Sequence, residues 1–448
     1  MTSFTQNKKD LLATLVNQCW RFVSGPIILL FIPLYLTPEQ QGYWYLFGSI
    51  SMLSVLADLG FTNNIVLQFS AHEYAHLHFD KTLLAGEEIY LKRLGSFFCF
   101  TLKWILTVCV IAFPLVYVIG IAFFVRDKVI GIYTLPWTIY TIGSVISLVN
   151  NAILAFIGGL NKIQVIEVIR LIVAVINTAV IALILIAGGN IYALAVGTLL
   201  SGSFIFVLVF GIFRRLLRQL LTISKGFSYN WKREILPLFT KFAIGSVCGF
   251  FVLSIYTPAM HYFHGPIYSG KTGITFTLTS AIGSLSSIWI YTILPKINML
   301  VSQKKWRDLD RLFKRRFLLS IITYLFFGLA LSAFLLLFGK FFILPKIISR
   351  FLPWNMVTVL FFCYFFQTIM SNWAYYLRAH KQEPYMAQAI AAAPIVFIGT
   401  LIAGKFLSIE YFFLGYVSYY VIFTPINYIT YLKCKKKWHS GGIIYNVE

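Results

Sequence analysis

The chain has 448 residues, of which 59% are hydrophobic and 12% are charged, and its mean hydropathy is +0.80. Soluble domains carry about a quarter charged residues, so this composition excludes a soluble globular protein. The net charge of +22 is spread over many short stretches and forms no basic domain. This pattern excludes a nucleic-acid-binding groove and favours contacts with the anionic headgroups of membrane lipids.

Apolar segments of about 20 residues, the length of one bilayer crossing, recur along the whole chain. Each must be helical, because lipid offers no partner to an unpaired backbone amide. We therefore predict an all-α polytopic membrane protein with about 12 transmembrane helices. The predicted spans are 12–36, 45–70, 95–123, 138–160, 168–187, 191–213, 236–262, 273–300, 317–339, 354–377, 388–404 and 411–432.

Lysine and arginine gather in alternate connecting segments. Such residues accumulate on the cytoplasmic side of membrane proteins, so the pattern predicts that both termini are cytoplasmic. The basic stretches are the N-terminus, 71–93, 161–170, 214–235, 301–316, 378–390 and the C-terminal tail. The first apolar stretch lacks a cleavage site and is predicted to remain as the first helix.

The segment "AHEYAHLHFD" contains the zinc-peptidase pattern H-E-x-x-H at His72, Glu73 and His76. In such a site the two histidines share one helix face and bind the metal, while the glutamate activates a water molecule. The metzincin continuation needs glycine and histidine where Phe79 and Thr82 stand, and no convincing third ligand follows. We interpret the segment as a polar cytoplasmic extension of the second helix.

The segment "HGPIYSGKTG" matches the P-loop pattern from Gly265 to Thr272. A working P-loop leaves a buried strand and opens a helix inside an α/β domain. Here the pattern falls in the predicted outside loop between the seventh and eighth spans, and the chain has no stretch outside the membrane long enough for a nucleotide domain of about a hundred residues. No other catalytic or metal-binding motif occurs, so the sequence predicts neither an enzyme nor a cofactor.

An internal repeat divides the chain near its middle. The fourth and fifth spans resemble the tenth and eleventh when Gly159 is set against Ala379, since both pairs show an asparagine, a short polar hinge and an apolar helix. This repeat predicts two six-helix lobes with a central cavity between them. The lobes are related by a pseudo-two-fold axis along the membrane normal. The predicted domains are an N-terminal lobe at 1–213, a basic cytoplasmic linker at 214–235 and a C-terminal lobe at 236–448.

The first two helices of each half carry polar faces at helical spacing. Transporters of this kind keep their substrate site between the halves, so we predict that these faces line the cavity. The faces hold Asn17, Arg21 and Ser24; Ser51, Ser54, Asp58 and Thr62; Lys241, Gly245 and Cys248; and Thr272, Thr275, Thr279, Gly283 and Ser287.

Four cations, Arg21, Lys103, Lys241 and Lys296, lie in predicted spans with one carboxylate, Asp58. A charge at bilayer depth costs at least about 3 kcal/mol, so each needs a partner or a role. Arg21 and Asp58 either form a structural ion pair or face a substrate, and the lysines either extend to the inner surface or enter the site. The cationic balance favours an anionic substrate. We therefore predict a substrate site of Arg21, Asp58, Lys241, Asn17, Lys103, Lys296 and Thr279.

Three segments carry a resemblance to a known family. "VLADLGFTNNIVLQFSA" resembles the second helix of O-antigen flippases of the Wzx type, "IPLYLTPEQQGYWYL" resembles their outside turn after the first helix, and "YYLRAHKQEPYMAQ" resembles their hinge between the tenth and eleventh helices. The resemblance implies the multidrug/oligosaccharidyl-lipid/polysaccharide exporter fold. It also implies export of undecaprenyl-diphosphate-linked oligosaccharide across a bacterial inner membrane by alternating access, with the polymerase and chain-length proteins of the pathway as partners.

Two other functions are compatible with parts of this pattern. A drug or cation exporter of the same fold would need carboxylates in the cavity, and Asp58 is the one available. A membrane-embedded glycan polymerase or glycosyltransferase would need a large outside loop, and the predicted outside loops are short.

Overall fold

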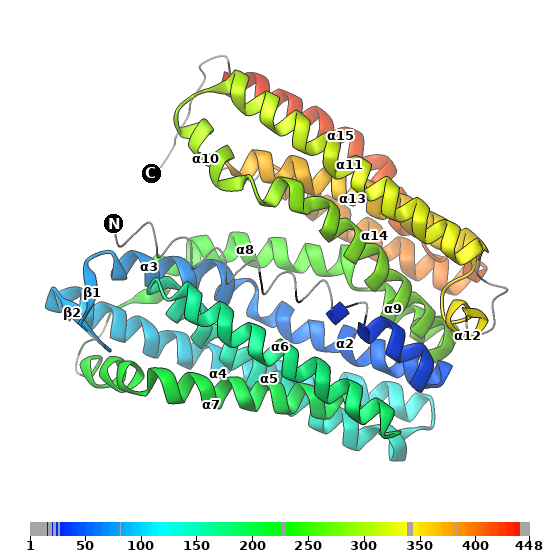
Figure 1. Cartoon of the computed structure of the whole chain (residues 1–448), viewed down its shortest axis with the longest axis horizontal. Coiled ribbons are helices and arrows are strands. Elements are labelled where there is room, and N and C mark those ends of the chain that lie inside the picture. The colour runs from blue at the N-terminus through cyan, green and yellow to red at the C-terminus, as the bar shows by residue number, and fades with distance from the viewer. Residues whose placement is uncertain are drawn as a thin grey trace. The chain divides into compact units, whose positions relative to one another are not determined.

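The computed structural model describes residues 27–80, 82–225, 227, 229–337, 344–380 and 384–439, together with Val16, Trp20, Ser24 and Gly25. The chain forms two compact units, Met1–Phe250 and Phe251–Glu448. In each unit the long helices run side by side (Figure 1).

In its described residues the first unit consists of helices, connecting turns and one small hairpin. Its elements are α2 (Pro38–Asp58), the π-helix η1 (Phe61–Val66), α3 (Leu67–Tyr74), β1 (Leu77–Asp80), β2 (Leu83–Gly86), α4 (Glu88–Arg126), α5 (Ile130–Gly159), α6 (Ile163–Ile186), α7 (Tyr192–Ile223) and most of α8 (Trp231–Leu253). The two strands are antiparallel, with Leu77 opposite Gly86.

The core of this unit lies around α5, which packs against α4 and α7. Phe97 of α4, Phe156 of α5 and Leu216 of α7 are buried there. The approach of α5 to α7 is so close that a Cβ atom on Gly143 would lie 2.7 Å from the backbone nitrogen of Leu199. A side chain at this position would force the helices apart, so glycine is required.

The second unit contains α9 (Tyr256–Tyr291), α10 (Leu294–Ser302), α11 (Trp306–Leu337), α12 (Leu344–Ile348), α13 (Trp354–Arg378), α14 (Met386–Phe406), the 3-10 turn η3 (Ile409–Tyr411) and α15 (Leu414–His439). Helix α9 packs against α11 and α13, and α14 packs against α15. Its core is aromatic: the ring centroid of Tyr256 lies 5.4 Å from that of Phe276 and 4.7 Å from that of Tyr416.

The predicted fold class is confirmed. Nine helical stretches in the described residues are long and apolar enough to cross a membrane, and one of them joins α8 to α9. In the described residues, every predicted span after 12–36 coincides with helical structure, and within 12–36 the described stretch 27–35 is also helical. The span 45–70 is divided into α2, η1 and α3, because Leu59 and Gly60 have positive φ angles of 50° and 74°.

One predicted boundary is confirmed and one is wrong. The break between the seventh and eighth spans lies in the predicted connecting segment: α9 consists of two helices that meet at Gly265 (φ 84°, ψ 178°), where the P-loop-like segment begins, and the Ser269 hydroxyl donates to the backbone oxygen of Thr257 at 3.2 Å across this turn. No strand precedes that segment, so its context is not that of a P-loop. The span 273–300 ends at Tyr291, and Lys296 therefore lies in the separate short helix α10.

Candidate functional site

Asp58 is the one carboxylate of the predicted site, and its side chain is buried at the end of α2. The backbone N–H of Thr62 donates to Oδ2 at 3.1 Å, and the Thr62 hydroxyl donates to Oδ1 at 2.7 Å. Both oxygens therefore accept hydrogen bonds from the first turn of η1. An acidic side chain that satisfies free N–H groups at the start of a helix stabilises that start, so Asp58 holds the break between α2 and η1.

The predicted polar face of the second helix continues across this break from Asp58 to Thr62, since the two side chains are hydrogen bonded. Ser51 lies on α2, where its Oγ is 3.2 Å from Oγ of Ser144 on α5. Beyond Gly60, the π-helix changes the angular spacing of the side chains that follow. Ser51 thus contacts a neighbouring helix of its own unit.

Lys103 lies on α4, which contains the most hydropathic of the candidate spans. Its side chain is exposed, and it joins none of the ion pairs found among the described residues. At a rise of about 1.5 Å per residue, it lies roughly 12 Å beyond residue 95, the start of the predicted span. An exposed ammonium group at this depth needs an anion or water nearby.

Thr279 lies on a face of small and hydroxyl side chains of α9, and this face is buried. Its hydroxyl donates to backbone oxygens of Thr275 and Phe276 on its own helix. One turn further on, a Cβ atom on Gly283 would lie 3.1 Å from Oγ1 of Thr368 on α13. Small residues with such self-satisfied hydroxyls let helices pack closely in membranes, so Thr279 has a packing role. Its contact with substrate stays a prediction.

The other predicted site residues are placed in less detail. Lys296 has an exposed side chain on α10, outside the candidate spans. Lys241 belongs to α8, and its side chain lies outside the described part of the structure, as do Asn17 and Arg21 entirely. The structure therefore does not place the predicted set together, and the roles of these residues in binding stay predictions.

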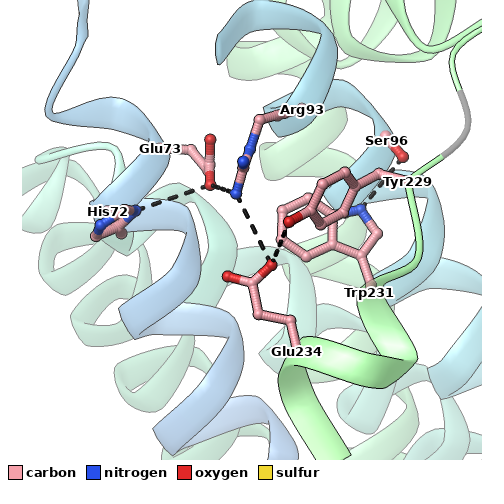
Figure 2. A network of polar contacts seen from close by, with 7 residues as sticks. All are labelled: His72, Glu73, Arg93, Ser96, Tyr229, Trp231 and Glu234. Atoms are coloured by element: carbon pink, nitrogen blue, oxygen red, sulfur yellow. Dashed lines mark hydrogen bonds and ion pairs between the residues drawn. The ribbon is translucent and has the colours of Figure 1, made fainter. Parts of the chain in front are cut away.

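The H-E-x-x-H segment forms part of an ion-pair network in the first unit (Figure 2). Glu73 is buried, and its Oε1 lies 2.8 Å from Nη2 of Arg93 at the start of α4. The guanidinium carbon of Arg93 lies 4.5 Å from the ring centroid of Tyr229, and Nη2 lies 3.8 Å from Oε2 of Glu234. Tyr229 in turn donates to Oε2 of Glu234 at 2.7 Å. Arg93 thus joins α3, α4 and the start of α8.

This network accounts for Glu73 without a metal. Helix α3 ends at Tyr74, so His72 and His76 do not share a helix face, and the ring of His76 stacks on Tyr90 at 3.9 Å. Among the residues that the structure describes, no group of three or more His, Cys, Asp or Glu side chains could hold a metal ion.

A second polar and aromatic cluster joins α11, α13 and α15 in the second unit. Asp310 accepts a hydrogen bond from the hydroxyl of Tyr376 at 3.0 Å, and its other oxygen lies 2.9 Å from Nζ of Lys435. His380 stacks on Trp438 with centroids 4.0 Å apart. Sequence reasoning did not predict the contacts in either cluster, because the partners are far apart in the chain.

Comparison with known proteins identifies the fold. No protein-family model matches the sequence, and no curated protein matches it. Solved structures do match over nearly the whole chain. An inward-facing multidrug resistance MATE family transporter of the MOP superfamily is 13% identical, with a TM-score of 0.56 over 97% of this chain and 99% of that chain. A MATE transporter in the straight conformation is 14% identical, with a TM-score of 0.57 over 97% of both chains.

A third similar structure is a MOP superfamily transporter from Pyrococcus furiosus, described as having a binding pocket of reverse polarity that suggests a different function. It is 12% identical, with a TM-score of 0.55 over 97% of this chain and 96% of that chain. The chain thus has the fold of MATE transporters of the MOP superfamily. At these identities the similarity describes the fold and leaves the substrate to be argued from the residues.

Proposed function

We propose that the protein is a flippase that moves undecaprenyl-diphosphate-linked oligosaccharide from the inner to the outer leaflet of a bacterial cytoplasmic membrane. In this proposal the lobes 1–213 and 236–448 alternate in access around the substrate, and the basic linker 214–235 connects them. The exported repeat unit then passes to the polymerase and chain-length proteins of the same pathway.

The observation that carries the proposal is the charge of the spanning helices. Lys103 is exposed in the apolar helix α4 and has no acidic partner among the described residues, whereas both oxygens of Asp58 accept hydrogen bonds from Thr62. The Lys103 ammonium group is available to a ligand, whereas the Asp58 carboxylate already accepts hydrogen bonds. This combination suits an anionic substrate such as a diphosphate. The resemblance of three segments to O-antigen flippases supports the same substrate class.

The fold supports transport in general. The MATE structures show that this arrangement of helices serves transporters, and the Pyrococcus furiosus protein is described as differing in pocket polarity. A change of charge on the same fold can therefore change the substrate.

A multidrug or cation exporter is the second candidate, because the similar structures include multidrug resistance transporters. Organic cations need an available carboxylate. The two hydrogen bonds from Thr62 to Asp58 count against this reading.

Transport of a fluorescent undecaprenyl-diphosphate oligosaccharide between the leaflets of proteoliposomes tests the proposal. We expect the wild type to move the lipid, and Lys103→Gln to slow it about tenfold, a loss equivalent to about 1.4 kcal/mol of transition-state stabilisation. Lys405→Gln is the matched control, because Lys405 is also exposed but lies in the last turn of α14.

The rival function predicts the opposite result. A protein that leaves the lipid in place but extrudes ethidium, with Asp58→Asn abolishing that extrusion, would be a cation exporter. Equal rates in Lys103→Gln and wild-type protein would remove Lys103 from the transport path.

A further inference from the structure

A small apolar hollow opens on α4 next to Lys103. Its volume is about 220 Å³, and it is lined by Trp104, Thr107, Val108, Ile111 and Ala112. Pockets for whole small molecules usually measure about 300–1,000 Å³, so this hollow suits one part of a larger ligand. Among the described lining residues Thr107 alone carries a hydroxyl, so the hollow favours a segment of hydrocarbon chain.

The charged side chain stands at one end of the hollow. Lys103 and Thr107 are one helical turn apart on the same face, and the Thr107 hydroxyl donates to the Lys103 carbonyl oxygen at 2.8 Å. Helical side chains lean toward the N-terminus of their helix, so the Lys103 ammonium extends from the hollow toward the start of α4. A ligand that met both would have an anionic head nearer residue 95 and an apolar chain running toward Ile111.

The wall of the hollow also holds an unsatisfied donor. The indole N–H of Trp104 is buried and has no acceptor among the described residues, while its ring packs against Phe61 at 5.3 Å and Phe239 at 5.2 Å. Leaving a buried donor without a partner costs about 1–3 kcal/mol. A ligand oxygen in the hollow would reach this donor only if the indole left its packing against Phe61 and Phe239, so Trp104 contributes its apolar ring to the hollow.

We infer that Lys103, Trp104 and the adjoining hollow form the docking site for the lipid carrier of the transported glycan, with its phosphate at Lys103 and the first part of its prenyl chain in the hollow. The inference rests on the proposed function and adds to it where on the protein the carrier binds. The head-to-tail direction along α4 suits a lipid of the leaflet that faces the start of this helix.

Photo-crosslinking of the full-length protein in phosphatidylcholine nanodiscs tests the site, with undecaprenyl phosphate as the probe. Ile111→p-benzoylphenylalanine places the reactive group in the hollow. Val118→p-benzoylphenylalanine is the matched control, since the two positions are 62% and 63% exposed and lie two turns apart on α4. We expect an undecaprenyl phosphate adduct at position 111, none at 118, and about a tenfold loss of the adduct when Lys103→Gln is added.

Two results would overturn the site. An adduct yield that is equal at positions 111 and 118, or that Lys103→Gln does not change, would mean unspecific contact with the prenyl chain. Displacement of the probe by phosphatidylglycerol would mean that the hollow holds bulk anionic lipid. Ala112→Trp gives a second measure that needs no reactive residue: the indole fills the hollow, so binding of undecaprenyl phosphate in native mass spectrometry should fall about tenfold.

The same mass spectrum separates this inference from the proposed function. Binding of undecaprenyl phosphate that neither Ala112→Trp nor Lys103→Gln reduces would place the carrier elsewhere on a flippase. A wild-type protein that binds no undecaprenyl phosphate at all would contradict both the site and the function.

Discussion

At the scale of single residues, His380 shows how a titratable ring is held neutral. It follows α13, where its Nδ1 lies 3.0 Å from the backbone oxygen of Tyr376, and it is buried against Trp438. Burial lowers the pKa of His380 below its usual 6.5, although the hydrogen bond to Tyr376 and the charge of Asp310 oppose the shift. Because the folded pKa is below the unfolded one, the neutral ring stabilises the fold at high pH and this contribution is lost as the pH falls.

We therefore expect the thermal unfolding midpoint of the detergent-solubilised protein to fall by about 2–4 °C between about pH 7.5 and pH 5.5, the range in which histidine titrates. His380→Phe keeps the stacking and removes the titration, so it should flatten this dependence. His72→Phe is the control, because His72 is 74% exposed. The neighbouring Asp310, Lys435 and His439 are unchanged in both variants, and an equal loss of stability in His380→Phe would assign the effect to one of them.

At the scale of secondary-structure elements, the Arg93 network fixes the beginning of α8. Glu73 is 1% exposed and its Oε2 has no partner among the described residues, so Arg93 carries most of the compensation for a buried carboxylate. Removing one member of a buried pair costs about 3–5 kcal/mol. Arg93 is itself 23% exposed, so we expect a smaller loss, about 2–3 kcal/mol, for Arg93→Met.

A double-mutant cycle with Glu73→Gln checks this expectation through thermal unfolding. If the pair is coupled, Arg93→Met should cost much less once Glu73 has become neutral. Lys92→Met provides the control, since Lys92 pairs with the exposed Glu88 within a single helix. Additive losses in the cycle would show that Arg93 acts through its packing on Tyr229 instead.

The helices and strands also show which parts of the fold could be predicted from the sequence. The length of the apolar segments was enough to locate α4 to α7 and α13 to α15, because every helix that crosses the bilayer must have about the same apolar length. The β1–β2 hairpin was missed because a distant residue supports it: Gln219 of α7 donates to the Leu84 carbonyl oxygen at 2.7 Å and accepts from its N–H at 2.9 Å. The end of α2 was missed because hydropathy carries no information about backbone angles. Leu59 has a positive φ, which is uncommon for leucine.

The candidate site was less predictable than the fold for a physical reason. The spacing of polar residues identifies one face of a helix, but it does not show whether that face meets another helix, lipid or a cavity. Hydroxyl side chains serve helix packing as well as ligand binding. Thr279 was predicted from its polar face and Lys103 from its charge, and the first is buried among the carbonyl groups of its own helix while the second is exposed. Charged residues are the better guide, because burying a charge costs far more than burying a hydroxyl.

At the scale of the whole molecule, each half of the predicted internal repeat has a buried asparagine that contacts another helix. Asn150 of α5 donates to the Gly202 carbonyl oxygen on α7 at 2.7 Å, and Asn372 of α13 donates to Oγ of Ser320 on α11 at 2.9 Å. Both are buried on the helix that precedes the hinge of each predicted repeat. The two asparagines contact different partner helices. The predicted repeat therefore concerns the order of the helices and does not extend to every contact between them. The boundaries of the two predicted lobes stay a prediction.

The orientation of the chain in the membrane decides which leaflet supplies the ligand of α4. Basic loops predict that the β1–β2 hairpin is cytoplasmic and that the turn between α6 and α7 is outside. In a cysteine-free background, a membrane-impermeant maleimide should label Ala187→Cys in intact cells and Thr82→Cys only after permeabilisation. Both positions are exposed, so unequal labelling reports sidedness and not burial. The reverse pattern would place the start of α4 outside, and Lys103 would then meet outer-leaflet phosphates at the end of transport instead of inner-leaflet phosphates at its beginning.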